Sequence, residues 1–381
     1  MAAGVAILGS TGSIGTSALR VLERQSERFV PVALTAHRDA RALAEQVRRW
    51  QPLYVGLVNG AEHADATWET GTDCLIRAAT LPTAAIVINA IVGAAGLPAT
   101  LAALRAGKRV ALANKETLVV AGDIVTATAR ECGGTIVPID SEHSAILQCL
   151  AGRAAHDVRR LVLTASGGPF RTWSADRIMS ATRDDALRHP TWQMGSKITI
   201  DSATLANKAL EVIEAHHLFG VPYDRIDVVV HPQSIVHSFV EFVDGSVLAQ
   251  LGVPSMELPI LFALTWPERV PDSGVPQFDP VASGPLTFEP VRSRDFPMLA
   301  LGIGAGRAGG SAPAVFNAAN EAAVALFLAG KIQFGQIAVL VEKALTSHVS
   351  EGEVSLAALW RADAAARRVV DIQGALITDI T

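Results

Sequence analysis

The stretch GVAILGSTGSIG at residues 4–15 decides the fold of this chain. An apolar run leads into a turn that contains Gly9, Gly12 and Gly15, and a helical pattern then continues to about Arg24. Gly9 permits a tight turn, Gly12 lets a pyrophosphate approach the N–H groups at the helix N-terminus, and Gly15 lets the helix pack on the strand. An ordinary tight turn is the alternative, but strand, glycine turn and helix in this order favour a dinucleotide-binding site.

The alternation of strands and helices continues to residue 138. Helical segments at 40–50, 97–106 and 116–130 separate further apolar runs, namely FVPVAL, LYVGLV, AAIVIN, RVALAN and TIVPI. This pattern predicts an α/β fold that begins with a Rossmann-like, doubly wound parallel sheet. The uncharged stretch 81–104 has the length of a membrane span, but polar residues, glycines and a proline interrupt it, so we expect a strand, a loop and a helix.

Changes in composition divide the chain into four parts. Residues 1–139 form the expected dinucleotide-binding domain, and 140–266 form an α+β catalytic domain with a hairpin signal at Asp244-Gly245. Residues 267–297 hold seven of the 19 prolines, which favours a long connector. Residues 298–381 are expected to form a small C-terminal helical bundle, because Ala/Leu/Val-rich stretches dominate it.

Composition excludes several classes of protein. Half of the 381 residues are hydrophobic and only 18% are charged, which excludes global disorder. The net charge of −5 provides no overall basic field for nucleic acid or an anionic membrane. Cys74, Cys132 and Cys149 are scattered, so neither disulfides nor a zinc site is expected. No signal peptide is visible before the first strand, and we therefore expect a cytoplasmic protein.

The end of the second strand bears on the choice of cofactor. The strand ends at residues 34–36, and the residues that follow Ala36 are His37 and Arg38. Basic groups at this position favour the 2′-phosphate of NADP over the free ribose of NAD. Asp39 argues for NAD if the register shifts by one residue; its alternative role is to cap the helix that begins at Ala40.

Polar residues follow two later strands of the expected sheet. Asn114, Lys115 and Glu116 emerge where the strand at 109–113 ends, at the carboxyl edge where such folds bind ligands. A substrate-facing Lys115 is favoured over a solvated residue at a helix start. Asp140 and Glu142 stand where the next strand turns into a helix expected to begin near residue 144.

Three carboxylates suggest a metal site. Asp140 and Glu142 alone are explained by the favourable interaction of acids with a helix N-terminus. Glu211 changes this interpretation, because a helix expected over 201–218 places it on one face with Asn207 and Lys208. Converging carboxylates with open coordination positions suit a hard divalent cation such as Mg²⁺ or Mn²⁺.

Two further segments suggest a phosphate site. TASGGPF at 164–170 supplies Ser166 and paired glycines, and DSATLANK at 201–208 places Ser202 near the expected start of the helix. With Asn207 and Lys208, these hydroxyl, amide and ammonium donors are typical of a phosphate monoester site.

The segment HPTWQMGSK at 189–197 has no core periodicity. Pro190 blocks a helix, Gly195 gives backbone freedom, and Trp192 and Met194 are large apolar side chains. A mobile flap is the functional interpretation of this segment. A loop anchored in the core by Trp192 is the alternative, and it is the commoner fate of a tryptophan.

Several motifs occur in one order. GSTGSIG, ANKE, DSEH, SGGPF, HPTWQMG, DSATLANKALE, HPQSIVHS, DGSVLAQLG and NAANE extend from about residue 5 to the C-terminal helices. Together they closely resemble the 1-deoxy-D-xylulose 5-phosphate reductoisomerase family. Ser196 departs from the resemblance, since many members carry Arg there, and members vary at His37-Arg38.

The resemblance implies NADPH-dependent rearrangement and reduction of 1-deoxy-D-xylulose 5-phosphate to 2-C-methyl-D-erythritol 4-phosphate, a step toward isoprenoid precursors. It also implies a homodimer, a divalent metal (Mg²⁺, Mn²⁺ or Co²⁺), and a flap that closes over the substrate. The implied NADPH-binding residues, together with those of the glycine turn and the second strand end, are Gly9, Thr11, Gly12, Ser13, Ile14, Ala36, His37, Arg38, Asn114, Glu116 and Gly195. The implied metal ligands are Asp140, Glu142 and Glu211, which with Lys115 are the catalytic candidates. The substrate-binding candidates are Lys115, Ser141, Glu142, Ser166, His189, Trp192, Ser202, Asn207, Lys208 and Glu211.

Two other classes of function share some of these features. A plain NADP-dependent oxidoreductase has the same first domain but needs neither three convergent carboxylates nor a phosphate site. A non-catalytic redox sensor needs the first domain alone.

Overall fold

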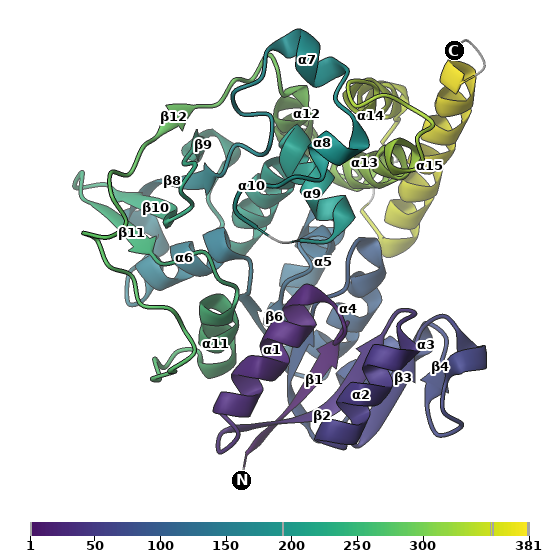
Figure 1. Cartoon of the computed structure of the whole chain (residues 1–381), viewed down its shortest axis with the longest axis vertical. Coiled ribbons are helices and arrows are strands. Elements are labelled where there is room, and N and C mark those ends of the chain that lie inside the picture. The colour runs from purple at the N-terminus through teal and green to yellow at the C-terminus, as the bar shows by residue number, and fades with distance from the viewer. Residues whose placement is uncertain (1, 193, 351, 353, 379–381) are drawn as a thin grey trace. The chain divides into compact units, whose positions relative to one another are not determined.

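The computed structural model describes residues 2–378 except 193, 351 and 353 (Figure 1). Its contacts divide the chain into two compact units. The first unit comprises Met1–Thr117, Asp123–Leu147 and Ser255–Gln277, and the second comprises Leu118–Gly122, Gln148–Pro254 and Phe278–Thr381.

The first unit contains a seven-stranded sheet in the order β4-β3-β2-β1-β5-β6-β7, in which all paired strands are parallel. The strands are β1 (Ala3–Leu8), β2 (Phe29–Ala36), β3 (Tyr54–Leu57), β4 (Glu69–Thr70), β5 (Ala84–Asn89), β6 (Arg109–Leu112) and β7 (Thr135–Pro138). The strand order reverses between β1 and β5, so the carboxyl ends of these two strands form the switch point at which doubly wound sheets bind ligands. This architecture confirms the predicted fold class.

Five helices, α1 to α5, lie between the strands of this sheet in the chain, and α6 follows its last strand (Figure 1). They are α1 (Ser13–Arg24), α2 (Ala40–Trp50), α3 (Asp73–Thr80), α4 (Leu97–Arg105), α5 (Glu116–Cys132) and α6 (Ser141–Leu150), with short 3₁₀ turns at Ala61–His63 and Ala94–Gly96. The uncharged stretch 81–104 is β5, a loop and most of α4, as predicted.

Helix α11 (Glu257–Thr265) also belongs to the first unit, although the sequence suggested a division at residues 139 and 266. Its apolar residues Ile260 and Leu264 lie in the hydrophobic core that β1 and α1 contribute to. Arg24 of α1 forms ion pairs with Glu257 and Asp272, each at 2.6 Å. The segment 255–277 therefore joins the N-terminal sheet because its apolar face and its carboxylates find partners there.

The second unit contains a five-stranded sheet in the order β11-β10-β8-β9-β12. Its strands are β8 (Val158–Ala165), β9 (Ile226–Val230), β10 (Val236–Phe242), β11 (Val247–Leu251) and β12 (Glu289–Pro290). β10 and β11 form the predicted hairpin, in which Gly245 adopts φ +87°. The Pro-rich segment supplies the short edge strand β12.

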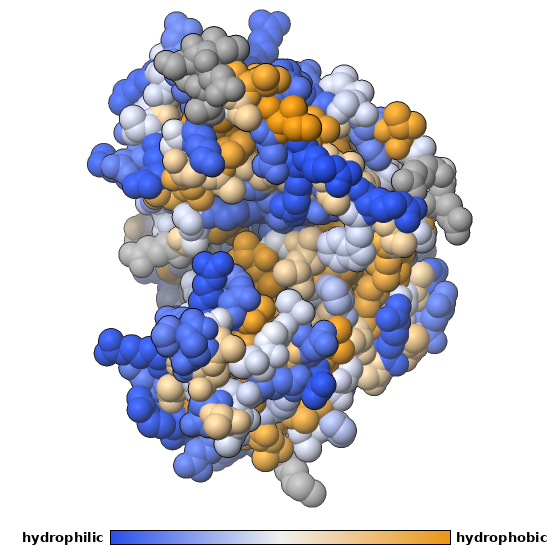
Figure 2. Space-filling view, turned by 90° about the vertical axis from the view of Figure 1, so that its right-hand side faces the viewer, coloured by the Kyte–Doolittle hydropathy of each residue, from blue (hydrophilic) through white to orange (hydrophobic). Residues whose placement is uncertain are grey.

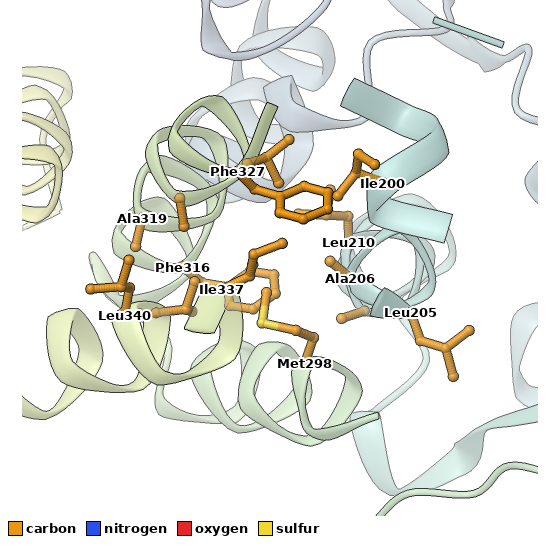
Figure 3. Close-up of a cluster of buried hydrophobic side chains, with 14 of the residues drawn as sticks. Ile200, Leu205, Ala206, Leu210, Met298, Phe316, Ala319, Phe327, Ile337 and Leu340 are labelled. Carbon is orange, nitrogen blue, oxygen red and sulfur yellow. The ribbon is translucent and has the colours of Figure 1, made fainter. Parts of the chain in front are cut away.

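Eight helices of the second unit surround a large hydrophobic core among the described residues. They are α7 (Ala175–Met179), α8 (Arg183–Ala186), α9 (Ser196–Thr204), α10 (Ala206–Phe219), α12 (Pro297–Ala308), α13 (Ala312–Leu328), α14 (Gln336–Ser347) and α15 (Leu356–Thr378), with 3₁₀ turns at Ala155–Asp157 and Tyr223–Arg225. In Figure 3, Ile200, Leu210, Met298, Phe316 and Ile337 point toward one another from five of these helices. The C-terminal helices are thus packed directly on α9 and α10.

The single helix predicted over 201–218 is wrong. Leu205 adopts a left-handed conformation with φ +62°, which ends α9 and begins α10. Ser202 consequently lies near the end of α9 rather than at the start of the helix that carries Glu211. An L-residue rarely adopts this conformation, so no local pattern indicates the break.

On the face drawn in Figure 2, hydrophobic residues form small groups among hydrophilic ones. No helix in the described part of the chain is long and apolar enough to cross a membrane. This agrees with the interpretation of residues 81–104 as a strand, a loop and a helix.

Candidate active site

The glycine turn after β1 has the conformation expected for dinucleotide binding. Gly9 adopts φ +85°, and its N–H donates to the carbonyl of Thr35 on the neighbouring strand at 3.1 Å. A side chain on Gly15 would place its Cβ 2.4 Å from the Gly9 carbonyl oxygen, so only glycine fits. Gly12 and Ser13 are exposed at the start of α1, which has no acidic residue in its first turn and no side-chain cap. The turn therefore presents the positive end of a helix to a ligand.

The residues after β2 show the capping role considered for Asp39. Its carboxylate accepts a hydrogen bond from the Ala42 N–H at 2.9 Å and caps α2. His37 contacts the Asn59 amide at 2.8 Å. Arg38 is exposed, and its guanidinium has no ion pair with any described residue. Asp39 thus has the capping role considered for it, and the exposed Arg38 is open to a ligand at this strand end.

A buried amide network lies at the carboxyl edge of the sheet. Asn114 is 1% exposed, and its Nδ2 donates to the carbonyls of Ile91 and Gly93 at 2.7 and 2.8 Å and to Glu116 at 3.0 Å. Asn89, at the end of β5, donates to the Gly96 carbonyl and to Thr100. Asn89 was missed as a positioning residue, although an asparagine that ends an apolar strand was a usable signal.

Lys115 and Asp140 form a buried ion pair. Lys115 Nζ lies 2.7 Å from Asp140 Oδ2, and the other carboxylate oxygen lies 3.0 Å from His143 Nδ1. Asp140 also accepts from the Glu142 N–H at 3.2 Å, which is the behaviour of a helix-capping residue. Ser141 donates its hydroxyl to Glu142 Oε2 at 2.7 Å. Helix α6 begins at Ser141, three residues earlier than predicted, because Asp140 caps it.

His189 joins the two serines predicted for the phosphate site. Its Nδ1 accepts from the N–H groups of Thr191 and Trp192 at 3.1 and 2.9 Å, so the ring proton lies on Nε2. That nitrogen is 3.0 Å from Ser166 Oγ and 3.1 Å from Ser202 Oγ. Burial lowers the pKa of His189 to about 4, and the ring is therefore a neutral N–H donor near pH 7.

The three residues of α10 predicted to share a helix face form hydrogen bonds with one another. Glu211 is 1% exposed and accepts hydrogen bonds from Asn207 Nδ2 and Lys208 Nζ, one on each carboxylate oxygen. The predicted shared helix face is confirmed, since these residues are three and four positions from Glu211 within α10. A buried carboxylate is costly without such partners.

The flap segment follows α8, and its last two residues, Ser196 and Lys197, begin α9. Its other described residues, 189–192 and 194–195, form no helix or strand, and residue 193 lies outside the described residues. Trp192 is half-buried and is not among the residues packed in the core of the second unit. Core anchoring, the alternative, thus finds no support. Gly195 adopts φ −62°, a value open to any residue, so the backbone freedom expected of it stays a prediction.

The predicted metal ligands divide between the units: Asp140 and Glu142 belong to the first and Glu211 to the second. Within the first unit, Lys115, Asp140, Ser141 and Glu142 form one connected set. Within the second, the structure joins Ser166, His189 and Ser202 in one group and Asn207, Lys208 and Glu211 in another. Residue-by-residue reasoning missed His189, and only the resemblance indicated it.

Models of one protein family match most of the chain. The model of 1-deoxy-D-xylulose 5-phosphate reductoisomerase matches residues 5–122, that of its C-terminal domain matches 136–219, and a second C-terminal domain model matches 251–369.

Similar proteins include the 1-deoxy-D-xylulose 5-phosphate reductoisomerase of Synechococcus sp. (strain JA-2-3B'a(2-13)), 51% identical over 96% of this chain and 95% of the relative. That of Xanthomonas axonopodis pv. citri is 50% identical over 96% of each. Among solved structures, the Zymomonas mobilis enzyme in complex with NADPH has a TM-score of 0.90 at 42% identity, covering 98% of this chain and 99% of that one. A DOX-P reductoisomerase in complex with NADPH, fosmidomycin and magnesium has a TM-score of 0.92 at 40% identity, with the same coverage.

The chain has a dinucleotide-binding turn at the switch point of a parallel sheet, and it also carries a cluster of hydrogen-bond donors suited to a phosphate. These features are those of an NADP-dependent oxidoreductase of the α/β class. Half of the aligned residues are identical to those of the relatives, over nearly the full length of both chains. This identity narrows the class of oxidoreductase to one family. The chain belongs to the 1-deoxy-D-xylulose 5-phosphate reductoisomerase family.

Proposed function

We propose that this chain converts 1-deoxy-D-xylulose 5-phosphate into 2-C-methyl-D-erythritol 4-phosphate with NADPH, in non-mevalonate isoprenoid precursor biosynthesis. The observation that carries the proposal is the group formed by Ser166, His189 and Ser202, which we name the phosphate cradle. It offers two hydroxyls and one neutral imidazole N–H. The imidazole Nε2 lies 3.0 Å from Ser166 Oγ and 3.1 Å from Ser202 Oγ. A plain oxidoreductase has no need for this group.

The first unit fits NADPH. The glycine turn leaves the start of α1 open to a pyrophosphate, and the Arg38 guanidinium is free for a 2′-phosphate. Asn114 and Glu116 lie at the same sheet edge, held by the Asn114 hydrogen bonds. When bound, NADPH supplies a hydride for the reduction of an aldehyde. The chain itself would hold the cofactor through the backbone N–H groups of the glycine turn and the guanidinium of Arg38.

The carboxylates fit a divalent metal. Asp140, Glu142 and Glu211 offer only oxygen ligands, which Mg²⁺, Mn²⁺ or Co²⁺ accept. Lys115 lies against Asp140, and Lys208 lies against Glu211, so each buried charge is balanced before a cation arrives. When bound, the metal acts as a Lewis acid toward the carbonyl and hydroxyl oxygens of the substrate.

The side chains of the chain orient the substrate for this chemistry. The phosphate cradle and Lys208 hold the phosphate at one end, and this remote binding energy fixes the reacting end. Lys115, held by Asp140 at 2.7 Å, presents a positive charge where negative charge develops during carbon–carbon bond migration. Trp192 on the flap segment covers the substrate and excludes water.

The decisive experiment measures NADPH oxidation with 1-deoxy-D-xylulose 5-phosphate and Mg²⁺ or Mn²⁺. Turnover to 2-C-methyl-D-erythritol 4-phosphate supports the proposal, while a plain oxidoreductase or a redox sensor gives no turnover. Ser202→Ala tests the phosphate cradle separately. A hydrogen bond to a charged group contributes about 1.5–3 kcal/mol, so KM should rise by roughly 10- to 100-fold. An unchanged KM would contradict the cradle.

We also propose that the enzyme is a cytoplasmic homodimer. Val243 and Val247, which flank the turn of the β10–β11 hairpin, are 66% and 52% exposed at an edge of the second sheet. Such an exposed apolar edge favours cover by a second copy. Cys74, Cys132 and Cys149 form no disulfide among the described residues, as a reducing compartment allows. Sedimentation analysis distinguishes a dimer from a monomer.

A further inference from the structure

A buried amide on α13 holds α9 in place. Asn320 is fully buried, and its Nδ2 donates to Asp201 Oδ1 on α9 at 2.8 Å. The other oxygen of Asp201 pairs with Lys197 Nζ at 2.8 Å, one turn earlier in α9. The Asp201 side chain is 1% exposed, so these contacts stabilise a charge that burial would otherwise disfavour.

The burial of Asn320 is energetically unfavourable if its role is only to fill the core. Its Oδ1 is buried and has no hydrogen-bond partner in the described part of the chain. Its neighbours Ala319 and Ala323 are fully buried apolar residues of the core. An apolar side chain could be buried at this position without leaving an unsatisfied hydrogen-bond acceptor. The hydrogen bond that Nδ2 donates is therefore the reason for an asparagine here.

Helix α9 carries one member of the phosphate cradle and supports another. Ser202 follows Asp201 directly, and its hydroxyl lies 3.1 Å from His189 Nε2. Gly168, in the loop that begins with Ser166, packs so closely on α9 that a Cβ there would lie 2.8 Å from the Ser202 carbonyl oxygen. A shift of α9 therefore disturbs both serines of the cradle.

We infer that Asn320 is a positioning residue for substrate binding: through Asp201 it fixes α9, and thereby Ser202 and the loop of Ser166, for the substrate phosphate. This inference rests on the proposed phosphate cradle and deepens it. It assigns to the C-terminal helices a part in substrate affinity, although Asn320 itself does not contact the substrate.

The chain offers a matched control on the same helix. Asn317 is equally buried and also has an unpartnered Oδ1, but its Nδ2 donates to Glu321 of its own helix at 3.0 Å. Asn320→Leu and Asn317→Leu therefore remove the same type of buried amide. Only Asn320→Leu removes the hydrogen bond to α9.

The experiment compares steady-state kinetics, competitive inhibition by inorganic phosphate, NADPH affinity and melting temperature for the wild type, both leucine variants and Ser202→Ala. Asn320→Leu should raise KM and the phosphate inhibition constant about tenfold, which corresponds to ~1.4 kcal/mol. It should change kcat by less than threefold and leave NADPH affinity unchanged. Asn317→Leu should leave KM within twofold of the wild type. If Asn320→Leu does not fold, the smaller change Asn320→Ser replaces it.

The outcomes separate the inference from the function. A raised KM for Ser202→Ala but not for the Asn320 variant overturns the positioning role and leaves the cradle intact. Equal rises in KM for both leucine variants, in step with their melting temperatures, also overturn it, because general loosening then explains them. An unchanged KM for Ser202→Ala removes the cradle and the inference together.

Discussion

The glycine turn of the first unit and the phosphate cradle of the second, as we propose them, would bind phosphate groups in different ways. The turn uses backbone N–H groups at the start of α1, and all of its residues fall within Gly9–Gly15. The cradle uses side chains from three segments, with Ser166 and His189 separated by 23 positions in the chain. One site depends on local backbone conformation and the other on the packing of distant segments.

The two sites also differ in their charges. Near the turn, Arg38 has no ion pair among the described residues and is open to a ligand. In the second unit, Lys208 and Glu211, which form a group separate from the phosphate cradle, are buried and paired with each other. The positive charge of Arg38 is therefore left for a ligand to neutralise. The charges of Lys208 and Glu211 neutralise each other before the substrate binds. Substitution of Arg38 should accordingly change the choice of cofactor, and substitution of Glu211 should change turnover.

Glu211→Gln should have the largest effect. It keeps the size of the side chain but removes a charge from the proposed metal site, so kcat should fall by about two orders of magnitude or more. NADPH affinity should not change, because Glu211 is not among the residues proposed to bind NADPH. The measurement is kcat over a series of Mg²⁺ or Mn²⁺ concentrations, combined with NADPH titration.

Glu321→Gln is the matched control for that variant. Glu321 also accepts from an asparagine four positions earlier, Asn317, and pairs with a cation, Arg367, at 2.7 Å. It should leave kcat close to the wild-type value. Near-normal kcat for Glu211→Gln would remove Glu211 from the metal site and leave Asp140 and Glu142 as simple helix-start acids.

Trp192→Ala should have the next largest effect. Because Trp192 lies on the flap segment and outside the core, kcat/KM should fall at least tenfold while the melting temperature stays nearly unchanged. Substrate-induced quenching of tryptophan fluorescence should also be lost. Trp173 packs against Phe170 at a ring-centroid distance of 4.6 Å, so Trp173→Ala should instead destabilise the fold by ~3–5 kcal/mol. A comparable loss of stability in Trp192→Ala would restore the core-anchor interpretation.

Arg38→Ala tests the first unit. A charge-assisted hydrogen bond to the 2′-phosphate contributes about 1.5–3 kcal/mol, so the preference for NADPH over NADH in kcat/KM should fall roughly tenfold or more. Arg41→Ala, at an exposed arginine on the adjacent α2, should leave the preference unchanged. If the wild type uses both cofactors equally well, the basic pair does not recognise the 2′-phosphate.

The smallest expected effect concerns pH. The pKa of His189 is about 4 in the folded state and 6.5 without burial, so the unfolded state binds more protons between these values. The contribution of His189 to stability is therefore complete above pH 6.5 and declines as the pH falls toward 4. Urea unfolding should show a weaker dependence on pH over this range in His189→Gln than in the wild type. Identical pH dependence would show that His189 titrates normally.

The sequence by itself determined the α/β order, the glycine turn, the hairpin at Asp244-Gly245 and the shared face of Asn207, Lys208 and Glu211. These features depend on contacts within a few residues, where the periods of strands and helices and the conformational freedom of glycine act directly. The family followed from the order of several such local motifs.

Only the tertiary structure decided which partner each polar group takes. It assigned Asp39 to the cap of α2, fixed the ring proton of His189 on Nε2, and broke the expected helix at Leu205. It also joined residues 255–277 to the first unit and Asn320 to Asp201, 119 positions away. The physical reason is that burial and hydrogen bonding depend on which distant segments pack together, and no window of sequence contains both partners.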